Sequence, residues 1–364
     1  MFVPRRDPVP DRGGPGVALE QRVSLSHSRI DLDVRNEPLR MKAPFHITGY
    51  TFHDPLATLV TLRDGAHIGR GEASGVYYLH DTPEGMLATL ESHREAIEAG
   101  LDREDLRTLL PAGGARNALD CALWELEAQR AGKTVWQLAG VQSPRPLLTT
   151  FTVGADTPEA MAAGAQGYAQ ARAIKLKLTG EADLDIARVR AVRAARPDVW
   201  LGVDAHQGYV ADPLQRLLPA LVDARVALLE QPCARGREAE LDGFDHVIPI
   251  AADESVQGLD EVDALVGRFD VVNIKLDKCG GLTEGLLIAE RARALGLQVM
   301  VGNMLGTSWA MAPAFVLGQQ CDVVDLDGPL FLAKDHTPGV VYRDGMLSCD
   351  DAVWGGAQAG GAQA

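Results

Sequence analysis

The sequence predicts an α/β protein that combines a (β/α)8-type barrel with a smaller N-terminal α+β domain. The chain has 364 residues, and a barrel of this kind takes about 250, which leaves room for a second domain. After Pro146, short apolar and β-branched runs recur, each followed by a polar helical stretch. Charged residues stand near the ends of most of these runs, where barrel enzymes place their active sites.

The segment before the barrel reads first as strands and then as helices. Residues 23–73 are rich in β-formers, with a turn at 63–65, and from 82 to 132 the apolar residues have helical spacing. Strands followed by helices suggest a separate α+β domain, which we assign to residues 21–146.

Eight short apolar runs follow, which is the number that a (β/α)8 barrel requires. Nearly continuous apolar runs suit parallel strands that are buried on both faces. An open doubly wound sheet would alternate in the same way, but no run is followed by a G-x-G-x-x-G dinucleotide motif. We assign the barrel to 147–330, with strands expected at 147–153, 173–178, 199–204, 226–231, 248–253, 270–275, 298–302 and 321–326.

Composition excludes several classes of protein. The net charge of −15 argues against binding to nucleic acid or to an anionic membrane surface, and no apolar run approaches the length of a membrane span. The five cysteines are scattered and form no C-x-x-C pair. A disulfide framework or a zinc site is therefore not expected, and a cytoplasmic location is the simplest interpretation.

The ends of the chain have the composition of tails. Residues 1–20 are rich in Pro, Gly and Arg and contain no apolar core of signal-peptide length, so we expect a disordered tail. Residues 331–355 are assigned to a segment that returns to the N-terminal domain, and 356–364 to a flexible tail. Because barrels of this size commonly associate through symmetric contacts, we also expect a homo-oligomer.

Three carboxylates end three consecutive predicted strands: Asp204, Glu230 and Asp253. One carboxylate at a strand end is often only a helix cap or a turn residue. Three in register repel one another unless a cation lies between them, and oxygen ligands without His or Cys favour Mg2+, with Mn2+ as the alternative. Glu254 points to the opposite face from Asp253, where it supports the site or holds a helix.

Lysines stand on two other predicted strands. Lys175 and Lys177 lie two residues apart, so their side chains share one face, and we expect that face to point into the barrel. Lys275 ends the sixth strand, on the opposite wall from the second. Lys278 lies beyond this strand and is expected to be a solvated loop residue. A lysine near a cation and another lysine loses proton affinity, which suits it to act as a base.

This arrangement suits proton transfer at a carbon next to a carboxylate. Loss of that proton creates an enediolate, whose oxygens a divalent cation stabilises. A base on one face can remove the proton while a conjugate acid on the other face returns one, which inverts a stereocentre. The same pair can also stabilise an anion while only one lysine transfers the proton, as in an elimination.

The chain resembles the enolase superfamily, specifically its muconate-lactonizing-enzyme subgroup, from about residue 23 to about residue 354. Lys175-Leu-Lys177 matches the family's Lys-x-Lys motif, which implies that Lys177 is the acid/base and that Lys175 assists it. The three strand-end carboxylates match the family's metal ligands, and Lys275 matches the opposing lysine. The N-terminal domain resembles the capping domain, whose loops close over the barrel mouth.

Within this subgroup, Asp325-Leu-Asp327 is similar to the Asp-x-Asp of dipeptide epimerases, which implies that the two carboxylates hold the free α-ammonium group of a dipeptide. Segments 110–124 and 272–284 look especially like those of L-Ala-D/L-Glu epimerases. One departure is His206, where these enzymes usually have Asn. The resemblance implies Mg2+-dependent epimerisation of a dipeptide at the carbon α to its C-terminal carboxylate.

The loop over residues 44–53 is the second departure, because it lacks the arginine that Ala-Glu epimerases use for the glutamate side chain. We expect Phe45 and Tyr50 of this loop to contact the substrate and to favour an apolar C-terminal residue. His46 and His53 are the loop's only candidate cations. The alternative is that these aromatic side chains only pack the domains together and that Arg40 or Arg70 reaches the substrate.

Other functions keep the same fold. An N-acylamino acid racemase, an o-succinylbenzoate synthase and a cycloisomerase all belong to the same subgroup, but Asp325 and Asp327 would repel acylated or dicarboxylate substrates. As an alternative, these two residues form only a capped turn before Gly328. A non-catalytic small-molecule sensor is disfavoured because both lysines and all three carboxylates are present.

Overall fold

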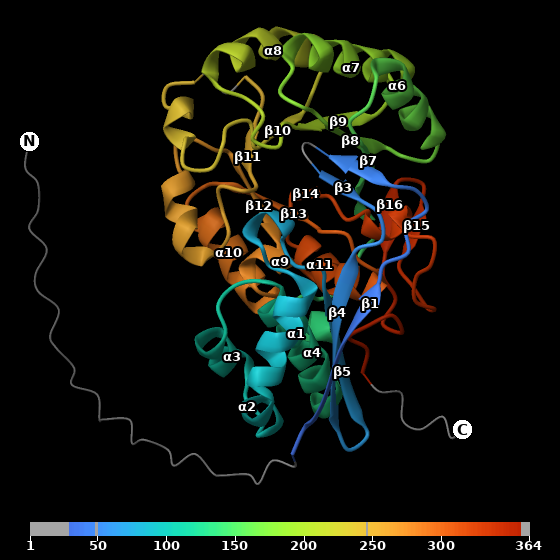
Figure 1. Ribbon diagram of the computed structural model, residues 1–364, viewed down its shortest axis with the longest axis vertical. Coiled ribbons are helices and arrows are strands. Elements are labelled where there is room, and N and C mark those ends of the chain that lie inside the picture. The colour runs from blue at the N-terminus through green and yellow to red at the C-terminus, as the bar shows by residue number, and fades with distance from the viewer. Residues whose placement is uncertain (1–28, 48–49, 245–246, 358–364) are drawn as a thin grey trace, which may run out of the picture.

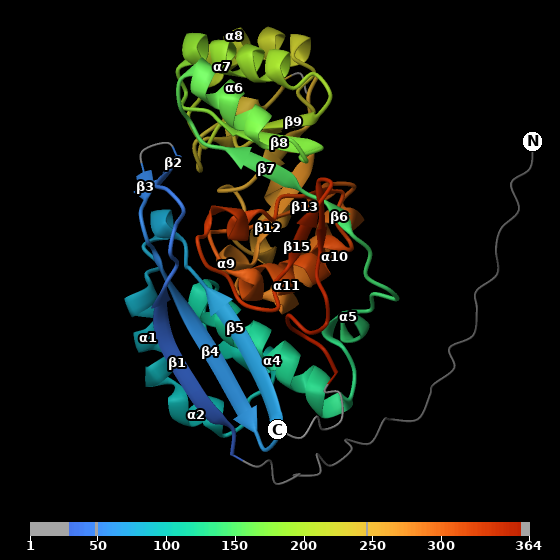
Figure 2. The same cartoon turned by 90° about the vertical axis from the view of Figure 1, so that its right-hand side faces the viewer.

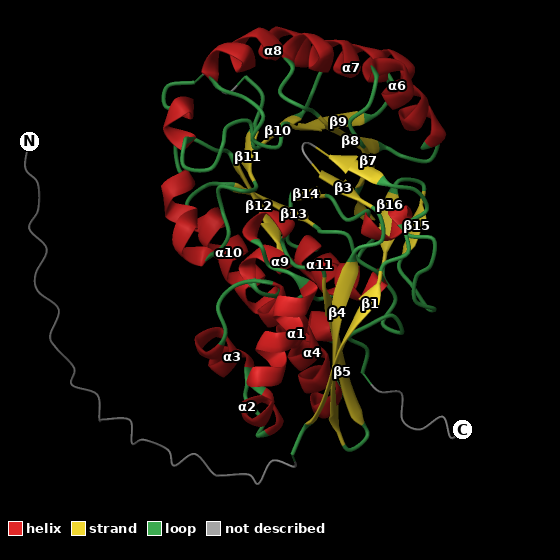
Figure 3. Ribbon diagram, in the orientation of Figure 1, coloured by secondary structure: helices red, strands yellow, loops and turns green. Residues whose placement is uncertain are grey.

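The computed structural model describes residues 29–47, 50–244 and 247–357. The tail expected over 1–20 and most of the one expected over 356–364 lie outside this part of the chain. Figure 1 and Figure 3 show a barrel at one end of the molecule and the N-terminal domain at the other. The predicted fold class is confirmed.

Eight parallel strands form the barrel, and their order in space is their order in the chain. Several strands are shorter than the predicted runs, since the flanking residues stay buried but lie outside the strand, as Val226 and Ile248 do. The strands are β7 (Thr150–Val153), β8 (Ala173–Lys177), β9 (Trp200–Asp204), β10 (Leu228–Glu230), β11 (Ile250–Ala252), β12 (Val271–Lys275), β13 (Gln298–Gly302) and β14 (Val323–Val324).

Helices pack around the outside of the barrel (Figure 1). After β10 and β11, however, the chain forms the 3₁₀ helices η2 (Glu238–Leu241) and η3 (Leu259–Leu265) in place of the longer helical stretches expected there. Glycines at 236, 243, 258 and 267 interrupt both connections, which disfavours longer helices. The other barrel helices are α6 (Pro158–Gly167), α7 (Ala182–Ala195), α8 (Ala211–Asp223), α9 (Leu276–Cys279), α10 (Leu282–Ala294) and α11 (Ser308–Gly318).

The capping domain is an antiparallel sheet covered by helices. The sheet order is β1-β4-β5, and helix α4 packs closely on β5. Glycine is required at Gly71, because a Cβ there would lie 1.9 Å from the carbonyl oxygen of Ala118. The elements are β1 (Asp31–Pro38), β4 (Leu56–Asp64), β5 (His67–Ala73), η1 (Tyr77–Leu79), α1 (Pro83–Ser92), α2 (Arg94–Glu98), α3 (Arg103–Leu109), α4 (Gly114–Ala131) and α5 (Val135–Leu138).

A short hairpin extends from the capping domain toward the barrel mouth. It consists of β2 (Phe45–Ile47) and β3 (Tyr50–Phe52), which pair in antiparallel fashion. Figure 2 shows it beyond the main sheet, on the side of the barrel where β7 lies. The hairpin is therefore placed to form part of the wall of a site at the mouth.

The C-terminal segment contacts both domains. Strands β15 (Val341–Arg343) and β16 (Met346–Ser348) join β6 (Leu147–Leu148) in a small sheet beside the barrel. Farther along, the Trp354 indole nitrogen donates a hydrogen bond to the Arg70 carbonyl of β5 at 2.8 Å.

Three buried carboxylates, which we call the interface carboxylates, join the capping domain to the barrel. Glu72 of β5 accepts hydrogen bonds from the backbone N–H and hydroxyl of Thr307. Asp120 of α4 accepts two from Thr283, at 3.0 and 2.6 Å. Asp277 of α9 accepts from the N–H groups of residues 74 and 75, both at 2.9 Å. All the donors are uncharged and belong to the other domain.

In the described part of the chain, no helix combines the length and apolarity needed to cross a bilayer. The five cysteine thiols are free.

Candidate active site

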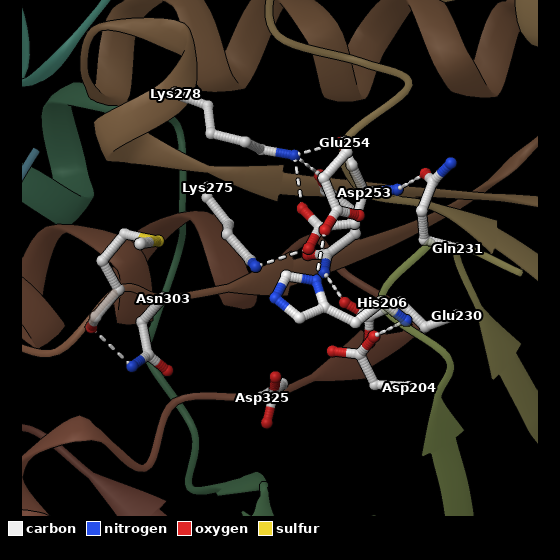
Figure 4. Close-up of polar contacts among 12 residues, drawn as sticks. Asp204, His206, Glu230, Gln231, Asp253, Glu254, Lys275, Lys278, Asn303 and Asp325 are labelled. Atoms are coloured by element: carbon white, nitrogen blue, oxygen red, sulfur yellow. Dashed lines mark hydrogen bonds and ion pairs between the residues drawn. The ribbon is translucent and has the colours of Figure 1, made fainter. Parts of the chain in front are cut away.

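Three buried carboxylates lie side by side at the barrel mouth. Asp204 and Glu230 end neighbouring strands and pair in register, and Asp253 directly follows β11. Each offers an oxygen, and the three oxygens lie within 4.8 Å of one another. Figure 4 shows the side chains converging from their strands. The structure therefore brings together the residues that the sequence predicted as metal ligands.

The cluster has the chemistry of a site for a hard cation. All three side chains are nearly inaccessible to solvent. Burial and the neighbouring charge of Asp204 raise the pKa of Glu230 to about 7. Burial also opposes ionisation of Asp204, but Lys177 and Lys175 outweigh it and lower the pKa of Asp204. An all-oxygen donor set at this spacing fits Mg2+.

Two lysines approach the cluster from opposite walls. Strands β8 and β12 are separated by three strands in either direction around the barrel. Lys177 on β8 donates to Asp204 Oδ2 at 2.5 Å, and Lys275 at the end of β12 donates to Asp253 Oδ2 at 2.6 Å. A substrate carbon above the cluster would therefore have one ammonium group on each face.

The carboxylates strengthen proton binding by two of the lysines. Burial would lower the pKa of Lys275, but the charges of Asp253 and Glu230 outweigh it and raise the pKa well above its ordinary value. Burial would also lower the pKa of Lys175, but the charges of Asp325 and Glu230 outweigh it and raise this pKa. We predicted that a lysine beside a bound cation and another lysine loses proton affinity. That statement concerns the metal-bound site and stays a prediction.

Lys278 corrects a prediction. We expected a solvated loop residue, but its side chain is buried, with 2% of the residue exposed. Its ammonium group donates to Asp253 Oδ1 at 2.6 Å and also to the Asp253 and Asn273 carbonyls, as Figure 4 shows for Asp253. The chain enters α9 directly after Lys275, and this helical turn brings Lys278 back beneath the cluster. The i, i+3 spacing of these lysines was the missed signal.

Asp325 and Asp327 lie on the wall next to Lys175. Strand β14 ends at Val324, so the two residues follow the strand rather than belonging to it. The Asp325 carboxylate accepts from Lys175 and from the hydroxyl of Thr150. Asp327 precedes η4 (Gly328–Phe331), but its side chain makes no cap hydrogen bond.

The Asp327 carboxylate has a different role from the one expected of a turn cap. It accepts from the backbone N–H of Thr152 on β7 at 2.7 Å. Burial and the charge of Asp325 raise the pKa of Asp327 to about 7. Both carboxylates line the same pocket as the lysines, so a cation placed between them would stabilise their ionised forms.

One side of the pocket is aromatic and apolar. Phe45 lines it, whereas Tyr50 is 45% exposed and packs behind Phe52 and Tyr77 with ring centroids 4.7 and 4.8 Å away. Tyr77 and Tyr78 were not predicted as site residues, because residues 74–81 fall between the predicted strands and helices. The aromatic wall, as we call this side, comprises Phe45, Phe52, Tyr77, Tyr78, Met304, Leu305 and Phe331.

The arginines considered for the substrate are engaged elsewhere. Arg40 pairs with Asp54 at 2.9 Å, and Arg70 pairs with the buried carboxylate of Glu125. His53 is exposed and outside the pocket lining. In the described part of the chain, the basic side chains that line the pocket are the lysines at 175, 177 and 275, together with His206.

The chain matches two family models that together span both domains. Residues 29–140 match the mandelate racemase/muconate lactonizing enzyme N-terminal domain, and residues 159–353 match the enolase C-terminal domain-like family. The metal-ligand candidates and all four lysines fall within the second match.

Three similar proteins place the chain within this family. The L-Ala-D/L-Glu epimerase of Escherichia coli is 40% identical over 86% of this chain and 98% of its own length. An N-acetyl-D-glutamate racemase of a Pseudoalteromonas species is 39% identical over 71% of this chain and 81% of its own. A dipeptide epimerase from Methylococcus capsulatus, solved with Mg and L-Arg-D-Lys, superposes with a TM-score of 0.83 at 31% identity, covering 88% of this chain and 96% of that one.

The resemblance inferred from the Lys-x-Lys and Asp-x-Asp motifs is therefore confirmed at the level of the family. The chain belongs to the mandelate racemase/muconate-lactonizing-enzyme branch of the enolase superfamily and, within it, to the isomerases of the dipeptide epimerase family.

Proposed function

We propose that this enzyme epimerises a dipeptide at the α-carbon of its C-terminal residue, with Mg2+ held by Asp204, Glu230 and Asp253. The observation that carries the proposal is the placement of Lys177 and Lys275 on opposite walls of one pocket, each within hydrogen-bonding distance of a cluster carboxylate. Two-base proton transfer, with removal on one face of the carbon and return on the other, requires this placement.

The residues of the chain have separable roles. Mg2+, when bound, stabilises negative charge on the oxygens of the substrate carboxylate. Lys177 and Lys275 then act in turn: the neutral amine on one face removes the α-proton, and the ammonium group on the other face supplies a proton. Lys175 is held by Asp325 and Glu230, so we assign it an assisting electrostatic role rather than proton transfer.

The other end of the dipeptide is assigned to Asp325 and Asp327. Both carboxylates are buried and line the pocket, and a free α-ammonium group between them would replace charge repulsion with attraction. This placement directs the substrate carboxylate toward the metal cluster and leaves the C-terminal side chain facing the aromatic wall.

The test is a dipeptide library incubated in D2O with Mg2+ and analysed by mass spectrometry. We expect one deuterium to be incorporated at the C-terminal α-carbon, together with the appearance of the epimer, and chelation should stop both. Turnover that persists in excess chelator would contradict the role of Mg2+. Lack of exchange with every dipeptide would contradict the proposed reaction.

Racemisation of an N-acylamino acid is the second candidate, and the 39% identity to an N-acetyl-D-glutamate racemase favours keeping it. The two reactions share the lysines and the cluster but differ in the acyl group attached to the nitrogen of the reacting residue. In a dipeptide this acyl group carries a free α-ammonium group, whereas in an N-acylamino acid it offers no charge to pair with Asp325 and Asp327. Comparing L-Ala-L-Phe with its N-acetyl derivative decides between them, because a dipeptide epimerase should prefer the free amine.

A further inference from the structure

His206 occupies an unusual backbone position at the mouth. It lies two residues beyond β9 with φ of +47°, a left-handed conformation that is uncommon outside glycine. Its backbone N–H donates to Asp204 Oδ1 at 2.9 Å, and the next residue, Gln207, donates its N–H to the Gln231 carbonyl at 2.8 Å. This turn directs the imidazole into the pocket, which His206 lines.

Both ring nitrogens of His206 have partners. Nδ1 contacts Glu254 Oε1, and Nε2 lies 2.7 Å from the Tyr77 hydroxyl. Glu254 is 1% exposed and meets the ring from the side of β11 (Figure 4). Because an ionised carboxylate only accepts, the Nδ1 hydrogen faces Glu254, and Nε2 shares a hydrogen bond with the Tyr77 hydroxyl. The buried carboxylate therefore fixes both the ring and its tautomer.

Tyr77 carries this connection from the barrel into the capping domain. Its ring lies 4.8 Å from that of Tyr50 and 5.5 Å from that of Phe52, with the latter pair edge to face. These two residues are the first and last of strand β3 in the hairpin, and Tyr78 packs on Tyr77 with ring centroids 5.2 Å apart. The residue that hydrogen-bonds to His206 of the barrel is therefore the same residue on which the hairpin packs.

We propose that Glu254, His206 and Tyr77 form a relay that positions the aromatic wall and thereby sets which C-terminal side chain the enzyme accepts. The selectivity step rests on the proposed function, because it requires the substrate side chain to face this wall. The positioning step rests only on the contacts described. His206 and Glu254 are positioning residues in this proposal, since they act through Tyr77.

The first experiment measures positioning without catalysis. Hydrogen–deuterium exchange of the β2 and β3 amides is compared in the full-length wild type, Tyr77→Phe and His206→Asn, with Tyr168→Phe as the control. Tyr168 packs on Phe151 and does not line the pocket. We expect exchange in the hairpin to become at least roughly fivefold faster in the first two variants, as for loss of one hydrogen bond, and to be unchanged in the control. Unchanged exchange in both relay variants would overturn the proposal.

The second experiment measures selectivity. For L-Ala-L-Phe, the Tyr77→Phe and His206→Asn enzymes should show a KM raised roughly five- to tenfold with kcat nearly unchanged, while L-Ala-L-Ala is affected little. The double variant should be no worse than either single variant, because the residues act as one unit. Equal losses for both dipeptides, or additive losses, would overturn the selectivity step. A wild-type enzyme that is inactive on all dipeptides would refute both the proposed function and the selectivity step. The hydrogen-exchange experiment would still test whether the relay positions the hairpin.

Discussion

Buried carboxylates occur in two regions of this molecule, and their partners differ. At the barrel mouth, Asp204 and Asp253 accept hydrogen bonds from lysine ammonium groups. Between the domains, the interface carboxylates Glu72, Asp120 and Asp277 accept from backbone N–H groups and hydroxyls. The same side-chain chemistry therefore meets charged hydrogen-bond donors in one region and uncharged donors in the other.

This difference separates a chemical role from a structural one. Burial raises the pKa of Glu72 and of Asp277 to about 7 and that of Asp120 to about 6, so these groups hold protons where exposed carboxyls do not. At the mouth, the pKa of Asp204 is instead lowered and that of Glu230 is raised to about 7. Shifted pKa values of this kind cluster at functional sites.

The largest expected effect comes from exchanging a carboxylate for an amide in each region. Asp253→Asn should reduce kcat about a thousandfold or more and abolish Mg2+ binding measured by calorimetry, as should Asp204→Asn and Glu230→Gln. Asp277→Asn is the matched control and should keep kcat within about threefold, because Asn retains the acceptor oxygen. Equal losses of kcat in Asp253→Asn and Asp277→Asn would remove the distinction between the regions.

The lysines at the mouth come next. Lys177→Ala and Lys275→Ala should each lose epimerisation by roughly 10²–10⁴-fold. Each should still exchange the α-proton of one stereoisomer with D2O, the one whose proton faces the surviving lysine. Proton NMR of separate L,L and L,D dipeptides measures this exchange. Normal epimerisation by Lys275→Ala would make this lysine structural and rule out a two-base mechanism.

The ammonium end of the substrate gives the third prediction. Removing one partner of a desolvated charge pair costs about 2–5 kcal/mol, so Asp327→Asn should lower kcat/KM for dipeptides accordingly. N-acetylation of the dipeptide should have a similar effect on the wild type and little further effect on the variant. A wild type that prefers the acetylated compound would support the racemase alternative.

Much of the mouth could be predicted from sequence because strand periodicity fixes which side chains face inward. Lys175 and Lys177, two apart on one strand, and Asp204, Glu230 and Asp253 at successive strand ends required only the eightfold pattern. The fold class followed from the eight apolar runs, and the family from a resemblance carried by these residues, Lys275 and the Asp-x-Asp motif.

The residues that sequence analysis missed depend on contacts without a period. Lys278 returns to the cluster through a helical turn, and Tyr77 meets His206 across the domain boundary, 129 positions away in the chain. The interface carboxylates were missed for the same reason: Asp277 lies 203 positions from its partner Ser74. Long-range polar pairs leave no local pattern in a single sequence.

The aromatic wall gives the fourth prediction, which concerns specificity. Full burial against Phe45, Phe52 and Leu305 would stabilise an apolar substrate side chain by roughly 1.5–3 kcal/mol. A glutamate side chain there would lose its hydration without a fixed guanidinium partner. L-Ala-L-Phe and L-Ala-L-Leu should therefore show higher kcat/KM than L-Ala-L-Glu. If L-Ala-L-Glu is preferred tenfold or more, one of the pocket's basic side chains serves the glutamate and the apolar expectation is wrong.

The smallest effect is expected at the domain interface and appears in stability rather than in turnover. Because the folded-state pKa values of Glu72, Asp120 and Asp277 are raised, the folded protein binds more protons than the unfolded chain over roughly pH 4 to 7. These groups therefore contribute stability that is fully present below the unfolded-state pKa and lost as pH rises through the folded-state value. Asp277→Asn cannot ionise, so its unfolding free energy should fall less between about pH 5 and about pH 8 than that of the wild type, by roughly 1–3 kcal/mol. Urea unfolding at both pH values measures the difference, with the exposed Asp183→Asn as the control. An identical pH dependence in wild type and Asp277→Asn would show that Asp277 is ionised across this range and that the two regions do not differ in charge as described.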